Sequence, residues 1–203
     1  MIKNIIFDLG GVLVDWNPVD KLRRMGLPED EVNIIAQNTA FSAEWNEIDK
    51  GAIEKEKLFD VMLARIPEEY RKDAASFLNE GVFDAIHSFS YSAGWLKSLK
   101  ERGLSLYLLT NYSEWMFDYH YKNEFSFTDS IDGMVVSGKV KLLKPDRAIY
   151  EALMKKYGLK SEECVFFDDR AENVEGARKC GINGIVFTDF ETARAKLNSC
   201  LEI

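Results

Sequence analysis

The chain has 203 residues, of which 46% are hydrophobic and 30% are charged, and its formal net charge is −8. This length predicts one main domain with room for a modest insertion, and the composition excludes a disordered, collagen-like or low-complexity chain. The acidic balance argues against nucleic acid or an acidic membrane as a partner, because either would require a basic face. No apolar run approaches the roughly 18 residues of a membrane span, and no signal peptide is expected because Asp8 interrupts the first apolar run.

The three cysteines, Cys164, Cys180 and Cys200, are odd in number and have no Cys-x-x-Cys spacing. A disulfide framework or a zinc site is therefore not expected, and a reducing cytoplasm is the expected compartment. Cys164 opens an apolar run and Cys180 closes a helical one, so we expect both to pack in the core. His87 and His120 have no acidic or cysteine partners at metal-ligand spacing, so surface or packing roles are expected for them.

Five short apolar segments recur along the chain, with helical patterns between them. They span residues 5–7, 104–109, 134–136, 164–167 and 185–187. Their near-continuous apolar character is typical of strands that are buried on both faces of a sheet. The alternation of strands and helices therefore predicts an α/β fold: a doubly wound, Rossmann-like parallel sheet with right-handed connections.

Helix boundaries are clearest in the second half of the chain. Ile149, Leu153 and Tyr157 recur at a spacing of four, with Pro145 before them and Gly158 directly after them. Proline at the start of a helix and glycine just beyond its end are typical boundary signals. This segment is therefore predicted to be a helix that begins at the proline.

Residues 18–79 interrupt the alternation because they contain no convincing strand. Their apolar residues recur at helical spacing, as at Leu58 and Met62. We therefore expect a core domain of residues 1–17 and 80–203, with a helical cap subdomain of residues 18–79 inserted after the first strand. Ligands bind at the carboxyl ends of the strands in open α/β sheets, so the cap is expected to cover the site. The alternative is a subdomain that only packs against the core.

The first predicted strand runs directly into Asp8, which is followed by Leu9, Gly10 and Gly11. A carboxylate at this point lies at the edge of a buried sheet, and two glycines let backbone N–H groups approach an anion closely. An Asp after a strand is often only a turn or capping residue, so this position alone is a weak indication.

Polar side chains also follow two other predicted strands. Thr110 and Asn111 end the second apolar run, Asp168 and Asp169 end the fourth, and Lys144 lies just before the predicted helix. Together with the first carboxylate, these residues offer a nucleophile, a hydroxyl donor, an ammonium group and an acidic pair that could hold a hard cation. Each of these residues alone is a weak indication, but all of them together, each at a strand end or a helix start, indicate a functional site.

The order of these segments resembles the four motifs of the haloacid dehalogenase-like hydrolases. The matching segments are Asp8-x-Gly-Gly-Val, Leu-Thr110-Asn, Lys144-Pro-Asp and Phe-Phe-Asp168-Asp169. The resemblance extends from residue 5 to about residue 189, with the expected cap in its usual position. It is greatest for the branch with a small helical cap, which includes bacterial sugar-phosphate phosphatases.

The resemblance implies a mechanism in which Asp8 attacks phosphorus and forms an aspartyl-phosphate. It also implies Mg²⁺ as the cofactor, held by Asp8, the backbone carbonyl of Gly10 and Asp169, with Asp168 as a further ligand or directly beside the metal. A hard cation with oxygen ligands suits this task because it offsets the repulsion between a carboxylate and a phosphate.

The resemblance further implies which groups bind the phosphate. Thr110 and the N–H groups near Leu9, Gly10 and Asn111 would hydrogen-bond the transferring phosphoryl group. Lys144 would neutralise both the nucleophile and the phosphate. Such positioning and electrostatic stabilisation supply most of the catalysis in phosphoryl transfer.

One position departs from the family pattern. The family usually carries a second Asp two positions after the nucleophile, which protonates the leaving group and then activates water, whereas this chain has Gly10. General acid–base catalysis typically contributes about 10²–10⁴-fold, so the change bears on turnover but not on the fold or on phosphate binding. Asp15 is a candidate substitute if the chain curls back, although a role at the cap hinge or in substrate contact is preferred.

We therefore expect a Mg²⁺-dependent phosphatase of a small phosphomonoester, with a sugar phosphate as the expected substrate. The alternative is a phosphate-binding or regulatory protein with little turnover. A signalling receiver domain is disfavoured because receivers carry their acidic pair at the first strand. Metal-independent dehalogenation is disfavoured by the pair Asp168-Asp169. Substrate contacts in the cap are expected around Glu44-Trp45-Asn46, and a monomer is expected because no long exposed apolar helix requires a partner.

Overall fold

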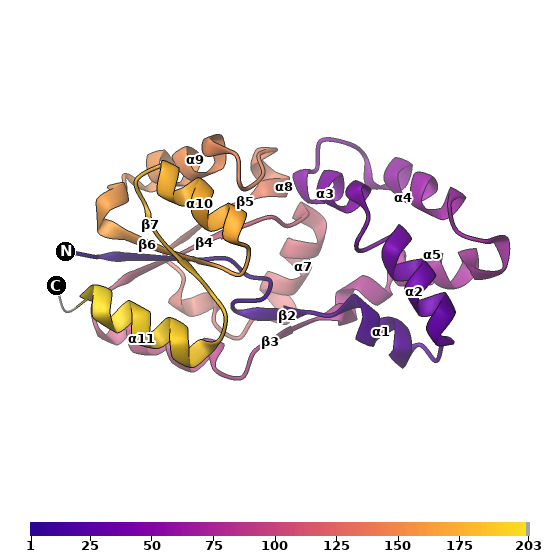
Figure 1. Ribbon diagram of the computed structural model, residues 1–203, viewed down its shortest axis with the longest axis horizontal. Helices are drawn as coiled ribbons and strands as arrows, with labels where there is room; N and C mark the ends of the chain where they lie inside the picture. Colours follow the sequence, from indigo (N-terminus) through magenta and orange to yellow (C-terminus); the bar gives the residue numbers. More distant parts are fainter. Residues whose placement is uncertain (202–203) are drawn as a thin grey trace.

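A five-stranded parallel sheet forms the centre of the computed structural model, which describes residues 1–201 (Figure 1). The strands lie in the order β5-β4-β1-β6-β7, and every neighbouring pair is parallel. They are β1 (Asn4–Phe7), β4 (Ser105–Thr110), β5 (Gly133–Val136), β6 (Cys164–Asp168) and β7 (Asn183–Val186). Each predicted apolar segment overlaps one of these strands, which confirms the doubly wound α/β fold.

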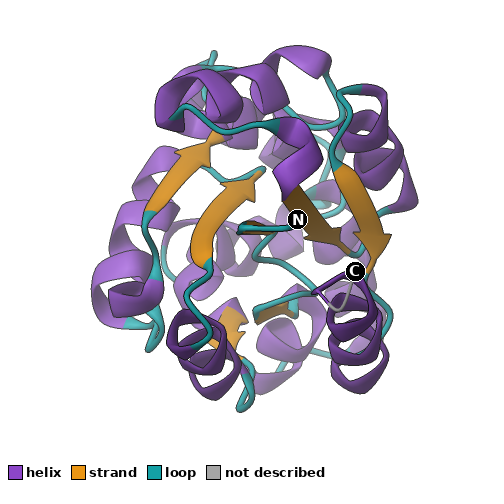
Figure 2. Ribbon diagram, turned by 90° about the vertical axis from the view of Figure 1, so that its left-hand side faces the viewer, coloured by secondary structure: helices purple, strands orange, loops and turns teal. Residues whose placement is uncertain are grey.

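Helices cover both faces of the sheet (Figure 2). Those that follow the cap are α6 (Ser92–Glu101), α7 (Glu114–Asn123), α8 (Ser137–Val140), α9 (Arg147–Tyr157), α10 (Ala171–Lys179) and α11 (Phe190–Leu201). Successive strand residues point to opposite faces, so Phe7 packs in the layer with α6 and α11, whereas Ile6 packs in the layer with α9 and α10. No helix within residues 1–201 is both long enough and apolar enough to cross a membrane.

Local sequence determines where α9 ends. Gly158 follows the last helical residue with φ at 64°, a left-handed conformation that costs glycine little. The start differs from the prediction, because α9 begins at Arg147 with Asp146 as its N-cap and Pro145 lies outside the helix. Pro145 therefore belongs to the connection that carries Lys144 rather than to the first helical turn.

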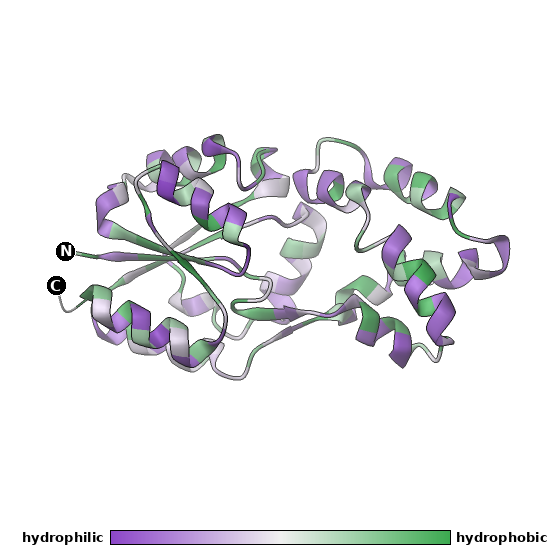
Figure 3. Cartoon of the chain, in the orientation of Figure 1, coloured by the Kyte–Doolittle hydropathy of each residue, from purple (hydrophilic) through white to green (hydrophobic). Residues whose placement is uncertain are grey.

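Residues 18–79 form five α-helices and a short 3-10 turn, and no residue among them is in a strand. The helices are α1 (Pro18–Arg24), α2 (Glu29–Asn38), α3 (Ala43–Lys50), α4 (Lys55–Ala64) and α5 (Arg71–Asn79). They lie beyond the carboxyl ends of the parallel strands (Figure 1). Each helix carries both hydrophobic and hydrophilic stretches, as expected when one face packs inward (Figure 3). The boundaries proposed for core and cap stay a prediction.

Two short strands connect the helical segment to the sheet domain. The chain leaves through β2 (Val14–Trp16) and returns through β3 (Ile86–Ser88), and the two pair antiparallel. Neither was predicted, because three residues are too few for a recognisable alternation.

The end of α3 docks on α8. Ser137 Oγ donates to the backbone carbonyl of Asp49 at 2.6 Å and accepts from the N–H of Tyr112 at 2.7 Å. Gly51 ends α3 with φ at 65°, and a Cβ there would lie 3.1 Å from the carbonyl oxygen of Gly138. The helical segment therefore contacts the sheet domain directly above the predicted site.

Candidate active site

Lys144 lies between two carboxylates at the carboxyl end of the sheet. Its Nζ is 2.8 Å from Asp8 Oδ1 and 2.7 Å from Asp168 Oδ2, and its side chain is fully buried. Asp8 follows β1 and Asp168 ends β6, and these strands are neighbours in the sheet. The parallel sheet thus brings together three residues that are up to 160 positions apart in the chain.

Asn111 and Gly176 position the backbone that carries Lys144. Asn111 Oδ1 accepts from the backbone N–H of Lys144 at 2.8 Å, and Asn111 Nδ2 donates to the Lys144 carbonyl at 3.0 Å. Gly176 lets α10 approach this connection, because a Cβ there would lie 2.7 Å from the carbonyl oxygen of Pro145. The Asn111 side chain therefore orients the lysine, while the expected hydrogen bond from the N–H near Asn111 to the phosphoryl group stays a prediction.

Asp168 is surrounded by donors. Besides Lys144, Asn173 Nδ2 bonds Asp168 Oδ1 at 2.9 Å and the N–H of Arg170 bonds the same oxygen at 2.9 Å. Asp168 is completely buried and does not line the cavity described below. No role for Asn173 was predicted from the sequence.

The carboxylates influence each other's ionisation. Burial raises the pKa of Asp8 to about 7, with Lys144 opposing the shift and Asp168 adding to it. Burial and Asp168 also raise the pKa of Asp169. Although burial acts to lower it, the pKa of Lys144 is raised because Asp8 and Asp168 stabilise its charge. The ammonium is thus held in its charged form beside the nucleophile candidate.

Asp8, Asp168 and Asp169 could hold a metal ion. One oxygen from each lies within 4.8 Å of the others, and carboxylate oxygens are the ligands that Mg²⁺ prefers. Gly11 is required for the third carboxylate to approach, because its φ is +69° and a Cβ there would lie 2.6 Å from Asp169 Oδ2. The donor set therefore fits a hard divalent cation.

The remaining predicted residues lie around the nucleophile candidate. The N–H of Leu9 donates to Asp8 Oδ1 at 2.7 Å, and Gly10 lines the cavity. Thr110 ends β4 with only 1% of its surface exposed and is not among the cavity-lining residues. Its predicted hydrogen bond to the phosphoryl group stays a prediction.

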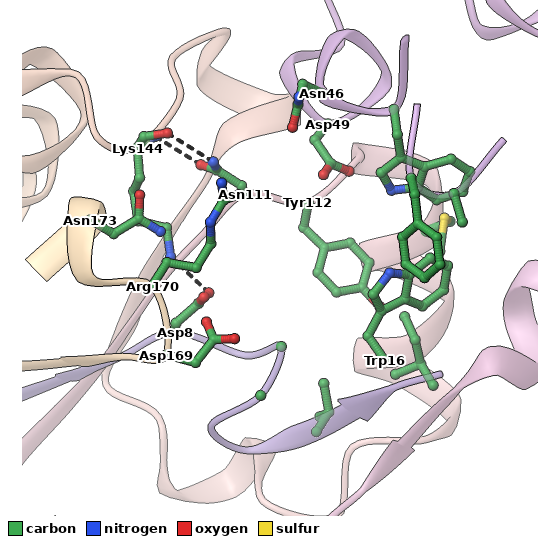
Figure 4. A pocket seen from close by; sticks show the side chains of 18 of the residues that line it. Asp8, Trp16, Asn46, Asp49, Asn111, Tyr112, Lys144, Asp169, Arg170 and Asn173 are labelled. Atoms are coloured by element: carbon green, nitrogen blue, oxygen red, sulfur yellow. Dashed lines mark hydrogen bonds and ion pairs between the residues drawn. The ribbon is translucent and has the colours of Figure 1, made fainter. Parts of the chain in front are cut away.

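A cavity of about 530 Å³ opens in front of Asp8 and extends under the helical segment (Figure 4). Trp16 and Trp45 stack on its wall with ring centroids 5.4 Å apart. The other apolar residues of the wall are Val14, Ala40, Phe41, Ile86, Tyr112 and Met116. Of the expected contact segment, Trp45 and Asn46 line the cavity, whereas Glu44 forms an ion pair with Arg65 outside it.

Asp49 also lines the cavity, and it was missed from sequence. Its carboxyl points into the cavity from the side opposite Asp8 (Figure 4), and Oδ1 accepts from the N–H of Ser113 at 3.2 Å. Burial raises its pKa well above the ordinary value, the Ser113 N–H opposes this, and the negative charge of Asp8 adds to it. The sequence feature that could have pointed to Asp49 is its spacing from Trp45, an expected substrate contact. The two are four residues apart and so share one helix face.

Both histidines have the roles expected of them. His120 is fully buried, with Nδ1 2.8 Å from the Tyr112 hydroxyl and Nε2 2.9 Å from the Phe83 carbonyl oxygen. His87 is exposed on β3. Cys164 is buried in the core, as expected, and Cys180 is partly buried against the α9 and α10 layer.

A buried ammonium and converging carboxylates lie at the carboxyl edge of the parallel sheet, an arrangement that suits the binding of an anionic group and a hard cation. Residues 2–181 match the model of the haloacid dehalogenase-like hydrolase family, and the chain belongs to that family. The resemblance inferred from its motifs is thereby confirmed.

Two curated relatives and one solved structure are similar over most of their length. A sesquiterpene phosphatase of Aspergillus oryzae is 28% identical, with 99% of this chain and 94% of that protein covered. A D-ribitol-5-phosphate phosphatase of Bacteroides thetaiotaomicron is 25% identical, with 89% of each covered. A haloacid dehalogenase family enzyme from the same bacterium, solved with magnesium and inorganic phosphate, shares the fold with a TM-score of 0.71. It is 22% identical, and 93% of this chain and 95% of that chain are covered.

Proposed function

We propose that this protein is a Mg²⁺-dependent phosphatase that hydrolyses a small phosphomonoester through an aspartyl-phosphate at Asp8. The observation that carries the proposal is Lys144, which is buried between Asp8 and Asp168 and lines the cavity. The phosphatases among the relatives support it, as does the structural neighbour that was solved with magnesium and inorganic phosphate.

The surroundings of Asp8 suit a nucleophile. The recorded bonds from Lys144 Nζ and the Leu9 N–H both go to Oδ1, which leaves Oδ2 without a partner among the described residues. Attack by Asp8 forms its bond to phosphorus as the bond to the leaving oxygen breaks. Water then attacks phosphorus, which releases inorganic phosphate and restores the carboxylate.

Asp8, Asp169 and the carbonyl of Gly10 would hold Mg²⁺, with Asp168 beside them. When bound, the ion would offset the negative charge of the carboxylates and of the phosphoryl group. Lys144 supplies a positive charge 2.8 Å from Asp8 Oδ1, and Asp168 and Asn111 keep it in place. This preorganisation matters because charge stabilisation is the main contribution that a protein makes to phosphoryl transfer.

The apolar wall of the cavity indicates which class of substrate fits the site. We propose an ester whose leaving group places an apolar face against Trp16 and Trp45. The ring of a sugar phosphate, the class expected from sequence, meets this condition through its C–H face, and so does an isoprenoid alcohol. The isoprenoid is the second candidate because a relative similar over the full length is a sesquiterpene phosphatase. The cytoplasmic location and the monomeric state stay predictions.

Phosphate release from a panel of esters tests the proposal. The panel contains sugar phosphates, polyol phosphates, isoprenoid monophosphates and 4-nitrophenyl phosphate. We expect turnover with Mg²⁺ and none after Asp8→Asn, while Asp60→Asn, at an exposed cap position, serves as the matched control. Tight binding of inorganic phosphate without turnover of any ester would instead favour the regulatory alternative raised by Gly10.

A further inference from the structure

Gly10 leaves this site without the acid that usually assists the leaving group, although the position has room for one. Nothing lies within 4 Å of where a Cβ would be, and its φ is outside the left-handed region that Gly11 occupies. The glycine at position 10 is therefore not demanded by the backbone. Another group can take over the proton transfer only if it faces the leaving group across the cavity.

Two further carboxylates line the cavity, Asp15 and Asp49. Asp15 is exposed on β2 in the connection to the cap, and no hydrogen bond of its carboxyl is recorded among the described residues. Asp49 is half-buried, and its carboxyl points into the cavity from α3 (Figure 4). Only Asp49 is held in place while it faces the nucleophile.

The hydrogen bonds that fix Asp49 come from the sheet domain rather than from the helical segment. Its Oδ1 accepts from the Ser113 N–H at 3.2 Å, and its backbone carbonyl accepts from Ser137 Oγ at 2.6 Å. Ser113 is the N-cap of α7, and Ser137 begins α8, so both follow strands that end at the site. The carboxyl is therefore fixed relative to Asp8 although it belongs to the helical segment.

We propose that Asp49 is the acid–base residue of this site, reaching the leaving oxygen from the side of the cavity opposite Asp8. The inference rests on the proposed phosphatase function. In the first step, the Asp49 carboxyl gives its proton to the ester oxygen as the bond from that oxygen to phosphorus breaks and Asp8 bonds to phosphorus. In the second, the Asp49 carboxylate takes a proton from water as the water oxygen bonds to phosphorus and the bond to Asp8 breaks.

The surroundings of Asp49 favour the protonated form that the first step requires. Desolvation raises its pKa, and Asp8 adds to that effect, whereas Lys144 and the Ser113 N–H oppose it. Tyr112 also lines the cavity, and burial, with a smaller contribution from the charge of Asp49, raises the pKa of that phenol. Burial raises the pKa of general-acid carboxyls in other enzymes in the same direction.

Asp49→Asn tests the proposal because the amide keeps an oxygen for the Ser113 N–H but cannot transfer the proton. Two esters with similar rings are compared with Mg²⁺ present: 4-nitrophenyl phosphate, whose leaving group is acidic, and 2-phenylethyl phosphate, whose leaving group is not. We expect alcohol release from the second to fall by about 10²–10⁴-fold. We expect the first to keep a rapid burst of nitrophenol, followed by slow turnover and accumulation of phosphorylated Asp8.

Gly10→Asp in the Asp49→Asn background supplies the rescue, because the open position beside the nucleophile receives a new acid. It should restore release from 2-phenylethyl phosphate and remove the accumulated phosphoenzyme. Asp60→Asn is the control for an exposed cap carboxylate and should leave both esters unaffected.

Three results would overturn the inference. An equal loss on both esters without phosphoenzyme would make Asp49 a docking residue for α7 only. Undiminished activity of Asp49→Asn would exclude it, and a selective loss in Asp15→Asn would then identify the other carboxylate as the acid. Absence of both turnover and phosphoenzyme in the native protein would refute the phosphatase function itself, and with it this inference.

Discussion

Removing the Lys144 ammonium should destabilise the protein strongly. Lys144→Met keeps the apolar stem but leaves Asp8 and Asp168 facing each other without a cation, and both are buried. Breaking a buried ion pair by removal of one partner costs about 3–5 kcal/mol. For a chain of this length, about 4 kcal/mol corresponds to a drop of roughly 8–16 °C in Tm, since each kcal/mol shifts it by about 2–4 °C.

The loss of unfolding free energy caused by Lys144→Met should increase with pH. Burial already raises the pKa of Asp8 to about 7 against the opposing effect of Lys144, so loss of the lysine raises it further. A carboxyl whose pKa is raised by folding stabilises the protein below its unfolded value and loses that contribution as pH rises through the folded value. The stability of Lys144→Met should therefore fall further below that of the native protein at pH 8.5 than at pH 5.5.

Urea unfolding followed by circular dichroism, in the presence of a chelator, measures both effects. Lys3→Met is the matched control, because Lys3 pairs with Glu163 at 2.7 Å while 60% exposed, and such pairs contribute about 0–1 kcal/mol. Adding Asp168→Asn to Lys144→Met should recover part of the loss by removing one buried charge. A deficit below about 1 kcal/mol, or one that is the same at both pH values, would refute the reasoning.

Three further predictions concern the metal, the glycine loop and the cavity wall. Chelation should abolish phosphate release and Mg²⁺ should restore it, with Ca²⁺ a poor substitute because its larger coordination shell misplaces the nucleophile; full turnover in excess chelator would contradict this. Gly11→Ala should abolish the rise in Tm on adding Mg²⁺, because its Cβ would collide with Asp169, whereas Gly94→Ala, at an open site, should preserve it. Trp45→Ala should raise KM for ring-bearing or isoprenoid esters more than for ethyl phosphate. An equal change in KM for both kinds of ester would show that the cavity wall does not select the substrate.

Much of the fold, and the placing of the proposed site residues at one edge of the sheet, could be predicted from local sequence. The strands β1 and β6 are buried along their whole length, so their residues form apolar runs that are visible without a structure. Asp8, Thr110 and Asp168 directly follow or end such runs, and parallel strands bring their carboxyl ends to one edge. The expected approach of Lys144 to Asp8 followed from the family resemblance, and the structure places Nζ 2.8 Å from Oδ1.

Other features required the tertiary structure. The short strands β2 and β3 exist only because they pair with each other, and three residues carry too little pattern to reveal that pairing. Of the two adjacent glycines after the first strand, Gly11 takes the positive φ, under Asp169, and Gly10 does not. Sequence alone does not distinguish two adjacent glycines, because only the neighbouring β6 loop determines which one is approached.

The position of Asp49 in the site also could not be predicted from the sequence. Its four-residue spacing from Trp45 places both on one face of α3, but spacing does not say what that face covers. The answer comes from hydrogen bonds of Asp49 to Ser113 and Ser137, which are 64 and 88 positions away. Sequence determined which side chains the sheet edge carries, because strand periodicity is local. Docking of the helical segment on the sheet domain decided which carboxyl faces Asp8 across the cavity, because that depends on contacts between segments distant in the chain.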